Sequence, residues 1–371
     1  MSRFLISCGG TGGHLAPGIA LAEGLHARDH ETRLLISEKK VDARLVEKYP
    51  ALTFLRVPGS PFGWSPRILL RCLGSQFRGV RFCLQLARTW RPDVIVGFGG
   101  FTSAPAVLAG RLLGIPVALH EANRVPGRAV RTLGRFARRV YLPPGIELRS
   151  VPAGATRHVG LPVRHEVQRT DQVAARIALG LEPDCPVLAI LGGSQGSTPL
   201  NDWVHACLPS LGRAGIQVYC VTGLGKGEGS ATRIESNGSP VRAVFVPFSD
   251  RIPEVLSAAD LVVSRAGAGT LTELVRCGTP AILVPFPQAA DDHQAANAAW
   301  FVREGGGMVV PQGELARLET AVREVIADAR RREEYRANLQ RMDQADHLGA
   351  LLRDLEELTT GRRQDGVLAL A

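Results

Sequence analysis

Short apolar runs alternate with helix-like stretches along the whole chain. Strand-like runs cover residues 4–8, 34–37, 94–96 and 117–120 in the first half, and 187–191, 218–222, 243–246, 261–264 and 281–284 in the second. Helical patterns follow several of them, at 15–25 and 201–211 for example. Runs that are apolar throughout are typical of parallel strands buried on both faces. The pattern therefore predicts the α/β class, with doubly wound parallel sheets.

The chain contains a short internal repeat. Residues 5–13 read LISCGGTGG and residues 188–196 read LAILGGSQG, each being a strand followed by a glycine turn and a helix start. Two Rossmann-like domains would each open this way, and 371 residues suit two domains. We place them at 1–163 and 164–344, with the Pro- and Gly-containing segment 152–162 as a linker. A helical pattern over 315–358 closes the chain, and its part around 345–360 is expected to pack back on the first domain.

The first glycine turn leads from Gly9 to His14. Glycines let the backbone approach a ligand, and N–H groups at a helix start favour an anion. Neither the dinucleotide fingerprint nor the phosphate-loop motif is met, and a tight turn that binds nothing stays open. His14 could take a proton from a substrate hydroxyl, or could merely pack or cap. Glu121, in the segment 120–123 that ends another strand, lies where ligand sites of α/β sheets form.

The second half contains residues that could bind phosphate, ribose or sugar hydroxyl groups. Ser194 could bond a phosphate or cap the next helix, and Glu273, about one turn into a helix, could accept from two ribose hydroxyls or act as a capping residue. Gln294, expected on a loop past a strand end, has an amide that suits sugar hydroxyls. Asp291, Asp292 and His293 have no partners at ligand spacing, so no metal is expected.

Charge divides the chain unevenly. The net charge is 44 − 35 = +9, but residues 1–163 carry 23 − 9 = +14 and the rest 21 − 26 = −5. Such a basic half favours an anionic partner, namely nucleic acid, an anionic membrane surface or a phosphorylated substrate. Segment 59–92 holds six arginines and no acid among apolar and aromatic residues, which suits an anionic lipid surface, with a helix packed on its own domain as the alternative. No RNA-binding motif accompanies it.

Other signals favour a cytoplasmic protein. No run of about 18 apolar residues occurs, as a membrane-spanning helix would require, and we expect no signal peptide. The seven cysteines include no C-x-x-C pair, which suits a reducing compartment.

Together these motifs resemble the MurG family of UDP-N-acetylglucosamine–N-acetylmuramyl-(pentapeptide) pyrophosphoryl-undecaprenol N-acetylglucosamine transferases, through almost the whole chain. The resemblance rests on segments 9–14, 97–100, 120–123, 160–164, 192–196, 264–273 and 292–294. It implies a GT-B fold, with two Rossmann-like domains facing across a cleft. The implied reaction moves N-acetylglucosamine from UDP-N-acetylglucosamine to the 4-hydroxyl of the muramyl sugar of lipid I (undecaprenyl-pyrophosphoryl-muramyl-pentapeptide), with inversion. It gives lipid II for peptidoglycan, needs no cofactor, and takes place on the cytoplasmic face of the inner membrane.

Residue roles carry over by position. The resemblance implies that Thr11, Gly12, Gly13 and Asn123 lie near the transferred sugar, and that Arg164 and Ser194 contact the donor. It places Ala268, Gly269 and Thr270 at the diphosphate, the backbone of Phe248 at uracil, Glu273 at the ribose and Gln294 at the sugar hydroxyls. His14 is our candidate base, and Glu121 is the alternative.

The chain departs from the family at Ala122, Leu161 and the segment 101–105, which concern acceptor-loop contacts. Three other functions stay open at this point. One is a different GT-B UDP-sugar transferase acting on a glycolipid, the second is a UDP-N-acetylglucosamine 2-epimerase, and the third is a membrane-binding module without catalysis.

Overall fold

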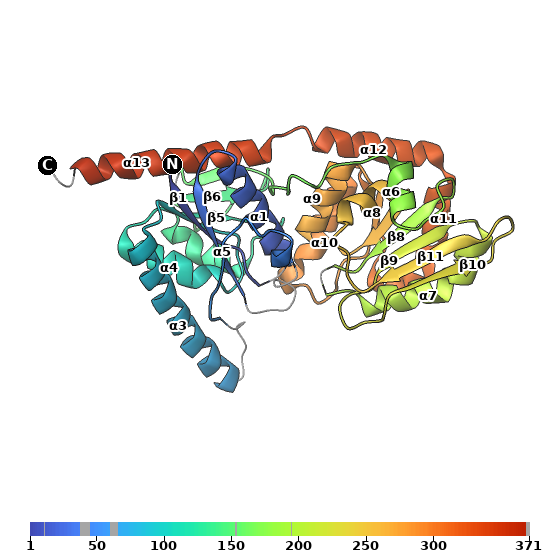
Figure 1. Ribbon diagram of the computed structural model, residues 1–371, viewed down its shortest axis with the longest axis horizontal. Helices are drawn as coiled ribbons and strands as arrows, with labels where there is room; N and C mark the ends of the chain where they lie inside the picture. The colour runs from blue at the N-terminus through green and yellow to red at the C-terminus, as the bar shows by residue number, and fades with distance from the viewer. Residues whose placement is uncertain (11, 38–44, 60–65, 153, 194, 369–371) are drawn as a thin grey trace. The chain divides into compact units, whose positions relative to one another are not determined.

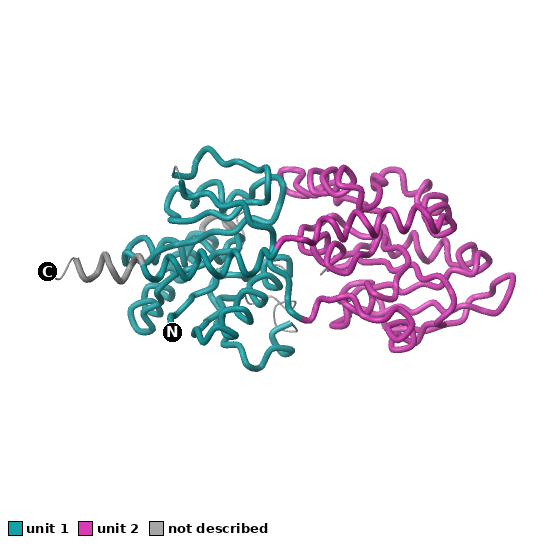
Figure 2. Tube along the Cα trace, turned by 90° about the horizontal axis from the view of Figure 1, so that it is seen from above, with its two compact units in different colours: residues 1–165, 346–371 teal, residues 166–345 magenta. Residues whose placement is uncertain are grey.

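A computed structural model describes the chain except for residues 11, 38–44, 60–65, 153, 194 and 369–371. The chain divides into two compact units (Figure 2). Unit 1 comprises residues 1–165 and 346–371, and unit 2 comprises residues 166–345.

Unit 1 is built on a parallel sheet in the order β3-β2-β1-β4-β5-β6-β7. The strands are β1 (Arg3–Ser7), β2 (Glu31–Ile36), β3 (Phe54–Arg56), β4 (Val94–Gly97), β5 (Val117–His120), β6 (Arg139–Leu142) and β7 (Thr156–His158). The chain runs outward from β1 through β2 to β3, then crosses back to β4 and continues to the other edge. Strand order therefore reverses between β1 and β4, and ligands of doubly wound sheets bind at the carboxyl ends of strands at such a point.

Helices cover both faces of this sheet (Figure 1). They are α1 (Gly12–His26), α3 (Pro66–Trp90), α4 (Ser103–Leu113), α5 (Arg128–Leu133), the short η1 (Gly134–Phe136) and α13 (His347–Leu368). On one face, Leu15 and Ile19 of α1 and Leu351 and Leu355 of α13 share an apolar core with the sheet. The other face is covered by α3, α4 and α5. Burial on both faces explains the apolar runs in the central strands β1, β4 and β5.

The last helix is fastened to unit 1 by two acidic residues. Asp354 accepts from the Tyr141 hydroxyl at 2.7 Å and from the Nε atoms of Arg139 and Arg157, each at 3.2 Å. Glu356 pairs with Arg28 at 2.8 Å. Arg157 belongs to β7, so the segment expected to be a linker contributes the edge strand of this sheet. That expectation was wrong because β7 is a short edge strand of three polar residues, and no apolar run in the sequence predicts a strand there.

Unit 2 repeats the plan in the order β10-β11-β9-β8-β12-β13-β14. Its strands are β8 (Val187–Leu191), β9 (Gln217–Val221), β10 (Ser230–Ile234), β11 (Val241–Val246), β12 (Leu261–Ser264), β13 (Ala281–Leu283) and β14 (Gly307–Val309). Every pairing is parallel except that of β10 with β11. Here the order reverses between β8 and β12, so the second glycine turn, like the first, lies at a switch point.

The helices of unit 2 are α6 (Gln172–Ala178), α7 (Thr198–Arg213), α8 (Ile252–Ala258), α9 (Ala268–Cys277), α10 (His293–Arg303), α11 (Leu318–Ala327) and α12 (Ala329–Met342), with the short η2 (Ala290–Asp292) and η3 (Gln312–Arg317). The long helical stretch expected at 315–358 is thus three helices. Asp328 caps α12 by accepting from the Arg331 N–H at 2.9 Å, which gives the first break a local cause. No helix in the described ranges is long and apolar enough to cross a bilayer.

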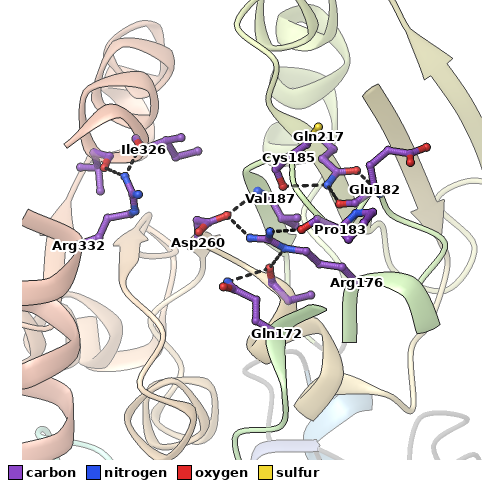
Figure 3. A network of polar contacts seen from close by, with 12 residues as sticks. Gln172, Arg176, Glu182, Pro183, Cys185, Val187, Gln217, Asp260, Ile326 and Arg332 are labelled. Atoms are coloured by element: carbon purple, nitrogen blue, oxygen red, sulfur yellow. Dashed lines mark hydrogen bonds and ion pairs between the residues drawn. The ribbon is translucent and has the colours of Figure 1, made fainter. Parts of the chain in front are cut away.

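A buried ion pair closes the amino-terminal edge of the unit 2 sheet (Figure 3). Arg176 of α6 donates to Asp260 at 2.7 Å and to the carbonyl of Ala258 at 3.1 Å. Asp260 also accepts from the backbone N–H of Val187 at 2.8 Å. The pair therefore ties α6 to the beginnings of β8 and β12, at the edge opposite the glycine turn.

Candidate active site

Two glycine turns meet at the switch point of unit 1. A Cβ atom on Gly100 would lie only 3.1 Å from the carbonyl oxygen of Gly9. The buried Thr102 hydroxyl donates to that same oxygen at 3.0 Å, and the Ser103 hydroxyl donates to the carbonyl of Gly99 at 2.6 Å. Gly99 and Gly100 have φ of +93° and +73°, a conformation that favours glycine. The sequence thus builds a close approach of two loops at the carboxyl ends of β1 and β4.

His14 lies in the first turn of α1, beside this loop pair. A Cβ atom on Gly99 would sit 3.4 Å from its Nε2, and one on Gly100 would sit 3.3 Å from its Nδ1. The ring is half-buried, so it rests against the glycine turn while part of it stays accessible. The neighbouring Gly12 is also half-buried and Gly13 is exposed. A half-buried imidazole at a switch point can exchange a proton with a ligand bound there.

Glu121, the alternative base, is committed to its own loop. One carboxylate oxygen accepts from the backbone N–H of Asn123 at 2.8 Å and from its side-chain amide at 2.9 Å. The other accepts from the backbone N–H of Gly127 at 2.6 Å. With only 5% of its surface exposed, Glu121 is placed to shape the loop that carries Asn123. This geometry favours His14 over Glu121 as a proton acceptor.

The neighbouring His120 is buried as a neutral ring. Its Nε2 donates to the carbonyl of Gly160 at 3.1 Å, and the ring stacks between Phe98 and Tyr141, with centroids at 5.4 and 6.2 Å. Gly160 in turn donates its N–H to His347 of α13 at 3.1 Å. Burial lowers the pKa of His120 to about 4.

This burial predicts a pH-dependent stability. Between an unfolded pKa of about 6.5 and the folded value of about 4, the unfolded chain binds a proton that the folded protein does not. The free energy of unfolding should therefore fall as pH drops through that window, by on the order of 3 kcal/mol from this residue. Urea titrations at several pH values measure it. His120→Gln keeps a donor for Gly160 but cannot titrate, so its curve should lack this part of the slope; equal slopes would contradict the assignment.

The glycine turn of unit 2 interlocks with the loop after β9. A Cβ atom on Gly196 would meet the carbonyl oxygen of Thr222 at 2.0 Å, and one on Gly192 would meet the backbone nitrogen of Ser197 at 2.4 Å. Asn201 of α7 donates to that Thr222 carbonyl at 2.9 Å. The backbone therefore has no room for side chains at these two positions.

Two glycines of this turn provide a matched pair of substitutions. Gly193 and Gly196 both have positive φ, +84° and +67°, but only Gly196 has atoms in the way of a Cβ. Gly193→Ala should lower the unfolding free energy by about 1–2 kcal/mol, the backbone cost alone. Gly196→Ala should cost at least about 2 kcal/mol more, because backbone atoms must move. Chemical denaturation of both variants tests the difference, and equal losses would show that the turn tolerates the displacement.

The start of α9 offers backbone N–H groups at the same edge. Gly267 precedes the helix, and Ala268, Gly269 and Thr270 form its first turn, all partly accessible and with no acidic side chain. Free N–H groups and the helix dipole favour an anion there. Glu273 lies partly accessible further along the same helix.

Gln294 is held by its carbonyl end. Its Oε1 accepts from the backbone N–H groups of Ala266 at 3.2 Å and Phe286 at 3.0 Å. What the side chain can offer a ligand is therefore its NH₂ group, a donor only. The residue belongs to the first turn of α10, which corrects the expectation that it lies on a loop.

Arg265 was not among the predicted site residues, although it stands in a segment that the sequence singled out. Its guanidinium donates to the carbonyls of Val284 at 3.0 Å and Pro285 at 3.3 Å. It also donates to the Ser197 hydroxyl at 2.8 Å and to the Gln312 amide oxygen at 2.6 Å. One side chain thus joins the loops after β8, β12 and β13 to η3.

The remaining predicted residues belong to other parts of the two units or lie outside the described chain. Arg164 is buried in unit 1, not unit 2, and donates to the Tyr49 hydroxyl at 3.2 Å. Phe248 follows β11 at the carboxyl edge of the unit 2 sheet and is half-buried. Thr11 and Ser194 lie outside the described residues. Within the described part of the chain, no three His, Cys, Asp or Glu side chains are grouped as metal ligands would be.

Two α/β units with ligand-type glycine turns at their switch points are the architecture of GT-B glycosyltransferases. A crystal structure of MurG from Acinetobacter baumannii has this fold, with a TM-score of 0.68 at 23% identity over 96% of this chain and 100% of that one. The calicheamicin glycosyltransferase CalG4 gives a TM-score of 0.68 at 16% identity, over 96% and 98% of the two chains.

Sequence relatives narrow the class. Residues 4–142 match the glycosyltransferase family 28 N-terminal domain and residues 187–349 its C-terminal domain. The UDP-N-acetylglucosamine–N-acetylmuramyl-(pentapeptide) pyrophosphoryl-undecaprenol N-acetylglucosamine transferase of Opitutus terrae is 60% identical over 97% of this chain and 96% of its own. The enzyme of that name from Parasynechococcus marenigrum is 40% identical over 85% and 84%. The chain belongs to glycosyltransferase family 28 and, within it, to the family of these transferases.

Proposed function

We propose that this enzyme transfers N-acetylglucosamine from UDP-N-acetylglucosamine to the 4-hydroxyl of the muramyl sugar of lipid I, forming lipid II for peptidoglycan. The observation that carries the proposal is the full-length similarity to transferases named for this reaction, 60% over 97% of the chain in one case. Both predicted glycine turns also lie at switch points, where such a donor and acceptor would bind.

Unit 2 would bind the donor. The first turn of α9 suits the diphosphate, Glu273 the ribose hydroxyls and Gln294 the sugar hydroxyls through its NH₂ group, with Phe248 offering backbone groups to uracil. In the reaction the bond from the anomeric carbon to the β-phosphate oxygen breaks, and its electron pair stays on UDP. Oriented N–H groups at a helix start can stabilise that developing charge.

Unit 1 would supply the base. The acceptor hydroxyl must lose its proton as its oxygen bonds to the anomeric carbon from the face opposite UDP, which inverts the configuration. His14 is our candidate to take this proton, since its half-buried ring rests on the Gly99–Gly100 turn. Glu121, with both oxygens already accepting N–H groups, would instead hold Asn123 in place.

A transfer assay tests the reaction. The enzyme is incubated with UDP-N-acetylglucosamine labelled in the sugar, with and without lipid I in detergent. Label should enter the lipid fraction only when lipid I is present, with release of one UDP for each sugar transferred. Conversion of the labelled nucleotide to its 2-epimer without lipid labelling would favour the epimerase. Labelling of another glycolipid but not of lipid I would favour a different glycolipid transferase.

We further propose that α3 holds the enzyme on an anionic membrane surface as a peripheral protein, on the cytoplasmic face. One side of α3 is packed in unit 1, with Cys83 and Trp90 buried. The other side exposes Phe77 by 72% and Leu73 by 59%, and a groove of about 490 Å³ is lined by residues of α3. Exposed arginines at 78, 81 and 88 stand among these apolar residues. Exposed aromatic and aliphatic groups beside arginines suit the interface of anionic lipids.

Charge reversal tests the membrane surface. Replacing Arg78, Arg81 and Arg88 by Glu should lower binding to vesicles with phosphatidylglycerol by at least about 100-fold, because loss of three cations at about 1 kcal/mol each already gives that factor before repulsion of the new carboxylates. The matched control reverses Arg303, Arg317 and Arg330 of unit 2, whose side chains are 66%, 78% and 91% exposed. Sedimentation with vesicles measures both. Equal losses would mean that net charge, and not α3, governs binding.

A further inference from the structure

Arg265 is a buried cation whose described partners are all neutral. Only 8% of its surface is exposed, yet its hydrogen bonds go to two backbone carbonyls, a hydroxyl and an amide oxygen. None of the ion pairs among the described residues includes it. A buried charge is normally paired, because desolvation costs several kcal/mol. Burial lowers the pKa of its guanidinium, the direction expected for a cation removed from water.

The location of the charge indicates the kind of anion that would pair with it. The guanidinium donates to Ser197, at the end of the glycine turn after β8, and belongs to the loop that leads into α9. It therefore lies between the end of the second glycine turn and the start of α9, whose first-turn N–H groups can bind phosphate. The guanidinium also donates to the carbonyls of Val284 and Pro285, which ties it to the loop after β13. Its terminal N–H groups are therefore already used within the protein.

We propose that the diphosphate of the donor nucleotide completes this site, with Arg265 as a positioning residue. Its four hydrogen bonds hold the diphosphate-binding loops together, and its positive charge acts through space on UDP without contacting it. The proposal rests on the proposed function, since it assumes a UDP-sugar donor. A positive charge in a site of low dielectric constant stabilises UDP more as the glycosidic oxygen gains charge, so it favours departure of the leaving group.

A substitution at Gln312 can cancel the positive charge of Arg265 while keeping the hydrogen bond between the two side chains. Gln312→Glu places a carboxylate where the amide oxygen already accepts from Arg265 at 2.6 Å. Gln312→Leu removes the hydrogen bond and adds no charge, so it is the matched control. Arg265→Lys keeps a cation but loses the planar fork, and Arg265→Gln removes the charge.

The measurement is the ratio of the dissociation constants of uridine and UDP, by calorimetry on the full chain. The two ligands differ only in the diphosphate, so general damage to the site moves both constants and leaves the ratio. We expect the ratio to fall about 10- to 100-fold in Gln312→Glu and Arg265→Gln, and to stay within about threefold of wild type in Gln312→Leu. Arg265→Lys keeps the charge but loses the hydrogen bonds that hold the loops, so its ratio should lie between these two groups. An unchanged ratio in Gln312→Glu would overturn the inference and leave Arg265 a purely structural tie. Absence of UDP binding by the wild-type enzyme would instead contradict the proposed function.

Discussion

His14→Ala should reduce kcat by about 10²- to 10⁴-fold, the range that general bases contribute. The acceptor hydroxyl would lose its proton acceptor, while the donor contacts proposed in unit 2 would stay intact. The dissociation constant for UDP should therefore change by no more than about twofold. Steady-state kinetics with lipid I, together with calorimetry with UDP, measure the two quantities separately.

The matched comparison for His14 is Glu121→Gln. Both carboxylate oxygens of Glu121 accept N–H groups of its own loop, three in all. In Glu121→Gln the new side-chain NH₂ group would therefore face one of these N–H donors and could not accept from it. Its loss of turnover should come with a lower melting temperature, whereas His14→Ala should melt close to the wild type. If Glu121→Gln melted normally and lost turnover while His14→Ala kept it, the base would be Glu121.

Asp260→Ala should lower the free energy of unfolding by about 3–5 kcal/mol. It would leave the buried guanidinium of Arg176 without its carboxylate and the Val187 N–H without its acceptor (Figure 3). A loss of this size is a large share of the stability of an average domain, about 5–15 kcal/mol. Urea denaturation of the variant measures it.

A double-mutant cycle tests whether Arg176 and Asp260 act as a pair, and UDP binding tests whether this pair affects the candidate site. Arg176→Met alone should also destabilise, but the double variant with Asp260→Leu should lose less than the sum, because neither member of the pair is then left buried without the other. Arg336, which lies 3.8 Å from Asp260, keeps Glu333 at 3.6 Å as its partner in both variants. The pair lies at the sheet edge opposite the glycine turn, so folded fractions of these variants should keep wild-type affinity for UDP. Additive losses would show that the two residues act independently.

Most strands inside the two sheets could be predicted from the sequence because they are apolar runs buried on both faces. Residues 94–96 and 261–264 are examples that need no other information. The interior strand β6 (Arg139–Leu142), which begins with an arginine, is not among the predicted runs. The edge strands could not be predicted either. In β7 the residues Thr156–His158 are polar, and β10 is largely exposed, so neither carries an apolar signal. Edge strands have one neighbour only, and their pairing is decided by the rest of the sheet.

Some residues of the candidate site could likewise be predicted from the sequence, and others could not. His14, Glu273 and the glycine turns could be singled out because each follows directly on a strand or opens a helix. Arg265 could not be given a role, because its partners Gln312 and Ser197 lie 47 and 68 positions away along the chain. The commitment of Glu121 to its loop was equally hidden, although its partners are close in sequence, because it depends on how residues 121–127 fold back.

The linkage in the product tests the central claim most directly. If unit 2 holds an α-linked UDP-sugar and a base in unit 1 activates the muramyl hydroxyl for a single displacement, the new sugar must be β-linked. Proton NMR of the purified disaccharide lipid should show one β-anomeric N-acetylglucosamine on the muramyl 4-hydroxyl, with UDP as the other product. An α-linkage, or label that never leaves the nucleotide, would contradict the account.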